Sequence, residues 1–136
     1  MLSMKKPSKK WKEFGQIIEI VNIRIEKQAR KLDKLQKKRT EIQSRLSQKW
    51  EHIEYLQFEL NTISLKNEQD SLKRLFIRRE GLRSQIESTF YDISVIKQDL
   101  NDVMFEIHEV LQEKKNLEKR KDRLTEMREQ LMYEQH

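Results

Sequence analysis

Apolar residues recur along the chain at alternating steps of three and four, which is the spacing of a heptad repeat. From Trp11 to Ile63 these positions are apolar except at Gln28, Arg39 and Lys49. The repeat runs without a slip and therefore predicts a long helix with a continuous apolar face that packs against another helix. The predicted core positions are Trp11, Phe14, Ile18, Val21, Ile25, Gln28, Leu32, Leu35, Arg39, Ile42, Leu46, Lys49, Ile53, Leu56, Leu60 and Ile63.

A second repeat of the same kind runs from Leu72 to Leu131. The two repeats are out of phase. The first one, extended past Ile63, predicts a core position at Asp70, which is polar, whereas the second repeat starts at Leu72. The second set of core positions is Leu72, Leu75, Arg79, Leu82, Ile86, Thr89, Ile93, Ile96, Leu100, Val103, Ile107, Val110, Lys114, Leu117, Lys121, Leu124, Arg128 and Leu131.

The polar segment between the two repeats is expected to form a turn. Asn67, Asp70 and Ser71 can each cap a new helix by accepting a hydrogen bond from its free backbone N–H groups. The sequence thus predicts an all-α fold, a long two-helix antiparallel coiled-coil hairpin, in a single domain of residues 1–136. Helix one is expected at about 9–65, the turn at about 66–70 and helix two at about 71–134. The alternative is one continuous helix in a parallel dimer that tolerates the phase break as a stutter.

Folding the two repeats about the middle of that turn predicts how they pair. Each polar core residue of one helix then faces an apolar residue, or the reverse, and long Lys and Arg stems can cover such a core while their charged groups reach water. The expected neighbours are Leu56 and Arg79, Lys49 and Ile86, Arg39 and Ile96, and Gln28 and Ile107.

Composition agrees with a helical protein that has a thin core. The chain of 136 residues is 38% charged and 35% hydrophobic, with two glycines and one proline. Because it contains no cysteine, it has neither disulfides nor thiol metal ligands, which fits a cytoplasmic location. No apolar run approaches the roughly 20 residues that span a bilayer, and the basic start leads into no signal-peptide pattern, so direct membrane insertion is not expected.

Catalytic and cofactor motifs are not recognisable. His52, His108 and His136 each lack a second metal ligand one helical turn away, so no metal site is expected. Gly15 and Gly81 belong to no glycine-rich phosphate loop, so no cofactor is expected. We therefore expect a binding protein that is not an enzyme.

Charge and surplus apolar residues mark the two ends of the hairpin as expected partner-binding sites. Residues 1–39 hold thirteen Lys and Arg against four Asp and Glu. Apolar residues outside the core positions have no place in a two-helix core and suggest contacts with other proteins. The open-end residues are Lys9, Lys10, Trp11, Lys12, Phe14, Ile17, Ile20, Ile23, Lys119, Arg120 and Arg123. The turn-end residues are Phe58, Leu65, Lys73, Arg74, Phe76 and Ile77.

The second half resembles a known family between Leu75 and Gln130. The stretches IRREGLRSQIE and QEKKNLEKRKDRLTEMRE look like the second helix of injectisome members of the type III secretion ATPase stalk family, the FliJ/YscO/SctO proteins. Such stalks resemble the coiled coil of the rotary ATP synthase gamma subunit. The resemblance implies a cytoplasmic protein at the base of the secretion apparatus that enters the pore of a hexameric export ATPase, promotes its assembly and activity, and links it to the export gate protein. Binding of secretion chaperones is a further possibility that it implies.

Three other functions remain open. A generic structural coiled-coil spacer or tether would assemble with a helical partner and be indifferent to any ATPase. Nucleic-acid binding would suit the net charge of +6, but acidic residues interrupt the basic stripe and no binding module is recognisable. A membrane-surface role meets the same objection, because the stretch from Gln85 to Glu113 holds seven acids and would be repelled by anionic lipid. We expect neither a nucleic acid nor a membrane as partner.

The hairpin is expected to be a monomer when isolated. Light scattering should give the mass of one chain, 16.7 kDa. Small-angle X-ray scattering should give a length of roughly 80–90 Å, set by 1.5 Å per helical residue. A dimer about twice as long would instead favour the continuous parallel coiled coil.

Overall fold

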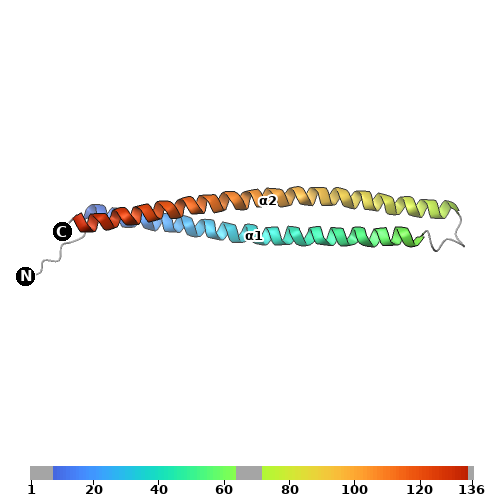
Figure 1. The fold of residues 1–136 in the computed structure, drawn as a ribbon, viewed down its shortest axis with the longest axis horizontal. Helices are drawn as coiled ribbons and strands as arrows, with labels where there is room; N and C mark the ends of the chain where they lie inside the picture. Colours follow the sequence, from blue (N-terminus) through green and yellow to red (C-terminus); the bar gives the residue numbers. More distant parts are fainter. Residues whose placement is uncertain (1–7, 64–71, 135–136) are drawn as a thin grey trace, which may run out of the picture. The chain divides into compact units, whose positions relative to one another are not determined.

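The computed structural model describes residues 8–63 and 72–134 and places them in two helices, α1 (Lys9–Ile63) and α2 (Leu72–Glu134). The helices pack side by side and run in opposite directions, so the fold is the expected all-α hairpin (Figure 1). The expected turn and its capping residues Asn67, Asp70 and Ser71 lie outside the described residues.

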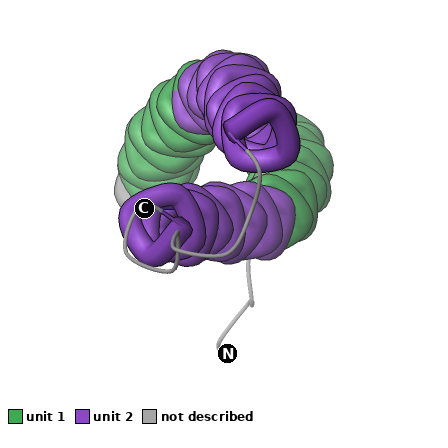
Figure 2. The backbone as a smooth tube through the Cα atoms, turned by 90° about the vertical axis from the view of Figure 1, so that its right-hand side faces the viewer, with its two compact units in different colours: residues 1–36, 105–136 green, residues 37–104 purple. Residues whose placement is uncertain are grey.

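The chain divides into two compact units, and each contains a segment of both helices (Figure 2). Unit 1 comprises residues 1–36 and 105–136, and unit 2 comprises residues 37–104. In unit 1 the start of α1 packs against the end of α2. In unit 2 the end of α1 packs against the start of α2.

A serine cap begins α1. The backbone N–H of Trp11 donates to Ser8 Oγ at 3.1 Å, and the N–H of Lys12 donates to the Ser8 carbonyl at 3.1 Å. The cap satisfies one of the free N–H groups of the first turn, a contribution of about 1 kcal/mol. It explains why the helix starts at Lys9, directly after the serine.

The core of each unit is built from the heptad positions. All buried hydrophobic residues among those described occupy predicted core positions, and each stabilises the hairpin by roughly 1.5–3 kcal/mol. In unit 1 they are Val21, Leu35, Ile107 and Val110. In unit 2 they are Ile42, Ile53, Leu56, Ile63, Ile93, Ile96 and Val103.

The pairing of the helices differs from the one expected. Lys49 Nζ lies 3.2 Å from Asp92 Oδ2, whereas Lys49 was expected near Ile86, which is more than one helical turn away along α2. The neighbouring rings of Trp50 and Phe90, 5.9 Å apart, agree with the same shifted register. The expected pairing was therefore wrong, because it took the middle of the turn as the point of symmetry.

The shifted register changes the surroundings of the first turns of α2. Ile63, the last described residue of α1, lies about level with Arg78, so no described residue of α1 lies opposite the first turn of α2. Two predicted core residues of these turns are exposed: Leu72, which is 84% exposed and lies before that level, and Arg79, which lies beside the last described residues of α1. Their assignment to the core is corrected by this finding.

Polar core positions are satisfied to different degrees. Thr89 is buried, and its hydroxyl donates to the Gln85 carbonyl at 2.7 Å, which meets its hydrogen-bonding need within α2. The Lys49–Asp92 pair is partly exposed and contributes less than about 1 kcal/mol. Gln28 Oε1 is buried and accepts no hydrogen bond from the described part of the chain.

The two sides of the helix pair have different chemistry. We call the residues that directly precede core residues the leading edge and those that directly follow them the trailing edge. An antiparallel pair brings the two leading edges together on one side and the two trailing edges on the other. The contact of Trp50 with Phe90 joins the trailing edges, and the core residue Lys49 reaches Asp92 on the leading edge of α2. Asp92 directly precedes the core residue Ile93. Trp50 directly follows Lys49, and Phe90 directly follows Thr89.

Complementary charges line the leading edge in both units. In unit 2, α1 contributes Lys38 and Arg45, and α2 contributes Asp92 and Asp99. In unit 1 the corresponding residues are Arg24 and Lys31 on α1 and Glu106 and Glu113 on α2. Opposite charges on facing edges favour this antiparallel pairing over arrangements that bring like charges together.

Replacing Gln28 with leucine should stabilise the hairpin. Gln28→Leu removes a buried oxygen that has no donor and adds apolar surface to the core, which should raise the free energy of unfolding by about 1–2 kcal/mol. Urea unfolding followed by circular dichroism measures the change. The control Gln48→Leu, at an exposed position, should change that free energy by less than about 0.5 kcal/mol. Equal effects of the two variants would contradict the burial of the Gln28 amide.

Candidate protein-binding surfaces

In unit 1 the side chain of Arg128 on α2 stacks on the ring of Trp11 at the start of α1. The guanidinium carbon of Arg128 lies 3.6 Å from the centroid of the Trp11 ring, and its Nε donates to the Trp11 carbonyl at 3.2 Å. Gly15 leaves the space for it, since a Cβ at that position would lie 2.6 Å from Arg128 Nη2. The absence of a side chain at Gly15 thus lets the arginine of α2 cross onto α1.

The leading edge of unit 1 combines exposed isoleucines with arginines. Ile17 and Ile20 are 38% and 52% exposed and directly precede core residues of α1. Arg120 and Arg123 are exposed and directly precede core residues of α2, so they lie on the same edge. The edge therefore offers apolar contact area beside two cations.

A hollow of about 250 Å³ continues this edge toward the helix ends. Its lining comes from both helices, and Lys10 and Met127 again directly precede core residues. The lining residues are Lys10, Phe14, Met127, Gln130 and Leu131.

The structure gathers only part of the predicted open-end residues. The leading edge and its hollow bring together Lys10, Phe14, Ile17, Ile20, Arg120 and Arg123. Trp11 is occupied by its stack with Arg128. The heptad places Lys9, Ile23 and Lys119 on outward faces and Lys12 on the trailing edge, all exposed.

Cations at the helix starts oppose helix stability. The first turn of α1 contains lysines and no acid, and the first turn of α2, from Leu72, contains Lys73 and Arg74 and no acid. The positive end of the helix dipole lies at the N-terminus, so each such cation costs roughly 0.3–1 kcal/mol. Helix formation therefore does not explain these residues.

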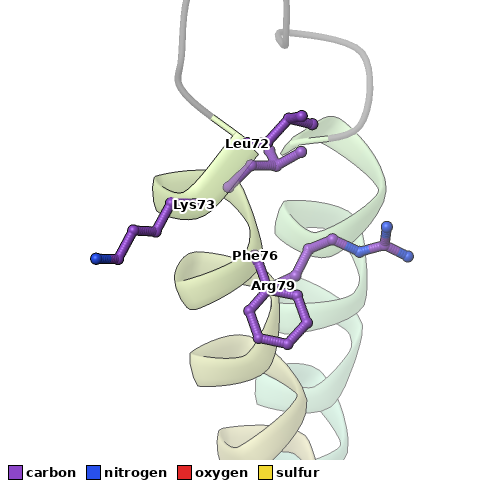
Figure 3. Close-up of a pocket in the computed structure, with 5 residues that line it drawn as sticks. Leu72, Lys73, Phe76 and Arg79 are labelled. Carbon is purple, nitrogen blue, oxygen red and sulfur yellow. The ribbon is translucent and has the colours of Figure 1, made fainter.

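The start of α2 forms a second surface, in unit 2. A hollow of about 500 Å³ is lined there by Leu72, Lys73, Leu75, Phe76 and Arg79. In the view of Figure 3, Lys73 and Arg79 extend to either side of the Phe76 ring, which is 64% exposed. An apolar centre with cationic sides suits a partner segment that is apolar and acidic.

The remaining turn-end residues are spread over different faces. Phe58 and Ile77 are 66% and 60% exposed, but the heptad puts each on the outward face of its own helix, so they do not join into one patch. Arg74 is exposed in the first turn of α2. Leu65 lies outside the described residues.

Sequence reasoning missed the residues that act in pairs across the helices. Trp50, Phe90 and Lys97 form an aromatic and cationic cluster, and Arg128 pairs with Trp11. The sequence contains a pattern that indicates the first cluster, because Trp50 and Phe90 each directly follow a polar core position. The role of Gly15 depends on the register and could not be read from the sequence.

Neither a metal site nor a membrane span is found in the described residues. No group of three or more potential ligands there could hold a metal ion, and His52 stacks against Tyr55 with ring centroids 6.4 Å apart. Within the same ranges no helix is apolar and long enough to cross a membrane.

Comparisons with protein-family models, curated proteins and solved structures gave no significant match to this chain. No function is therefore transferred from a relative.

The two glycines should respond differently to alanine. Gly81 has open space around its Cα, so Gly81→Ala should gain the helix propensity of alanine, about 0.5–1 kcal/mol. Gly15→Ala gains the same amount but displaces the Arg128 guanidinium from Trp11, which loses about as much, so its net change in unfolding free energy should be near zero.

A double-mutant cycle separates these effects. In an Arg128→Met background, Gly15→Ala should recover the full gain shown by Gly81→Ala, because no guanidinium is left to displace. The measurement is the urea midpoint at constant slope. A Gly15→Ala gain that is the same in both backgrounds would contradict displacement of the Arg128 guanidinium by the alanine side chain.

Proposed function

We propose that the chain is the central stalk of a type III secretion system. Its open end binds the pore of the hexameric export ATPase and promotes assembly and activity of the ring. The protein acts by binding and not by catalysis, in the cytoplasm at the base of the secretion apparatus. Its other end, around the start of α2, reaches toward the export gate protein, and secretion chaperones are possible further partners.

The observation that carries this proposal is the leading edge of unit 1. A hairpin whose helix ends present isoleucines, a hollow and a surplus of cations fits a partner that is apolar and acidic. The resemblance of the stretch from Leu75 to Gln130 to secretion stalks names the class of that partner. The energetic cost of cations at the start of α1 gives independent support for a binding role.

The test measures hydrolysis by the export ATPase of the same cell, purified, with and without the hairpin. The hairpin should raise turnover and the fraction of hexamer. The double variant Arg120→Glu/Arg123→Glu should need about tenfold more hairpin for the same stimulation, because two attractions become repulsions.

The matched control is Arg30→Glu/Lys115→Glu, which changes the net charge equally at exposed positions of unit 1 that lie off the leading edge. It should stimulate nearly as well as the unchanged protein. Equal loss in both variants would reduce the interaction to net charge. If the folded, unchanged hairpin gives no stimulation at all, the stalk function fails and a structural spacer becomes the better account.

A further inference from the structure

The trailing edge of unit 2 contains a half-exposed aromatic cluster. The rings of Trp50 and Phe90 meet edge to face at 5.9 Å, and Lys97 Nζ lies 5.5 Å from the centroid of the Trp50 ring. Trp50 and Phe90 are 40% and 43% exposed. Partly exposed tryptophans that neighbouring side chains hold in place are frequent anchors of protein interfaces.

The trailing edge from this cluster to Thr40 and Met104 is nearly free of charge, whereas Glu54 and Glu87 lie on the same edge one turn beyond the cluster in the other direction. Along α1 it continues through Ser47, Gln43 and Thr40. Along α2 it continues through Ser94, Lys97, Asn101 and Met104, which is 50% exposed. We call these residues, with Trp50 and Phe90, the trailing-edge patch. Lys97 is its one charged residue, in a chain of which 38% is charged.

The low charge is specific to this edge. The leading edge of the same unit carries Lys38 and Arg45 opposite Asp92 and Asp99. Solubility alone would favour charges on both edges. The patch thus combines apolar residues with uncharged polar ones, and the other side of the same helix pair is charged.

We propose that the trailing-edge patch binds one amphipathic helix of a partner protein, with an acidic residue placed against Lys97. The patch runs along α2 from Phe90 to Met104, which is about 21 Å, or four helical turns, and along α1 from Thr40 to Trp50, which is about 15 Å. Two packed helices leave a groove along each edge, and the small side chains of Ser47 and Ser94 let a third helix approach closely. Apolar side chains of that helix contact Trp50, Phe90 and Met104.

Charge selects this occupant over a second copy of the chain. Two patches facing each other in register would set Lys97 against its own copy, and like charges oppose that contact because the nearest acids of the edge, Glu54 and Glu87, lie beyond the patch. A partner helix with Asp or Glu at that point neutralises the cation instead. The proposal does not depend on the secretion function, which uses the leading edge of unit 1 and the start of α2.

A charge-swap experiment tests the proposal with defined peptides. The first probe is an 18-residue fluorescein-labelled helical peptide with leucine on one face and a single glutamate at the middle of that face's border. The second has lysine in place of the glutamate. By fluorescence anisotropy the unchanged protein should bind the glutamate peptide about fivefold more tightly, which is about 1 kcal/mol. Lys97→Glu should reverse the preference.

Two further variants locate the binding. Trp50→Ala should weaken binding of the glutamate peptide at least tenfold, and Ser94→Arg, which fills the groove without removing an aromatic ring, should do the same. The control Arg78→Glu makes the same charge change as Lys97→Glu on the leading edge and should leave the preference unchanged. Circular dichroism confirms that each variant is folded.

Three outcomes would overturn the proposal. One is a peptide preference that Lys97→Glu leaves unchanged. Another is an affinity that Trp50→Ala and Ser94→Arg do not alter. The third is sedimentation showing that the unchanged protein is a dimer that Trp50→Ala converts to a monomer, which would assign the patch to a second copy of the chain.

Discussion

Burial of one apolar stripe on each helix is the constraint on which the structure depends. A hairpin of two helices has no other core, so side chains at heptad positions provide most of the apolar burial that offsets the entropy of ordering the chain. Val21 and Ile96, which are 1% and 2% exposed, are examples of stripe residues that the opposite helix buries almost completely. No hydrophobic residue outside the stripe is buried in the described part of the chain.

Electrostatics and aromatic contacts decide which stretches of the stripes meet. The stripes alone permit several registers, because a shift by one heptad again brings apolar residues together. The contacts of Lys49 with Asp92 and of Trp50 with Phe90 favour one of them in unit 2, and the Arg128–Trp11 stack favours one in unit 1. Each of these contacts is modest, and their effect is selection among registers more than stability.

The sequence predicted the fold class and the core because both follow from a local spacing of three and four residues. It could not predict the register, which depends on side chains far apart in the chain, and so the expected contact of Lys49 with Ile86 was wrong. The candidate sites followed the same division. The exposed isoleucines were visible as apolar residues outside the repeat, whereas the hollow between Lys10 and Met127 and the space at Gly15 exist only once the helices are paired.

The difference between the two edges in unit 1 has a consequence for any ring-shaped partner. The leading edge carries Ile17, Ile20, Arg120 and Arg123, and the trailing edge carries none of them. A ring of identical subunits is rotationally symmetric, but a helix pair with unlike edges is not. If the hairpin lies in the pore of such a ring, only the subunits that face the leading edge can make the basic and apolar contact, so subunits that are chemically identical would have different surroundings.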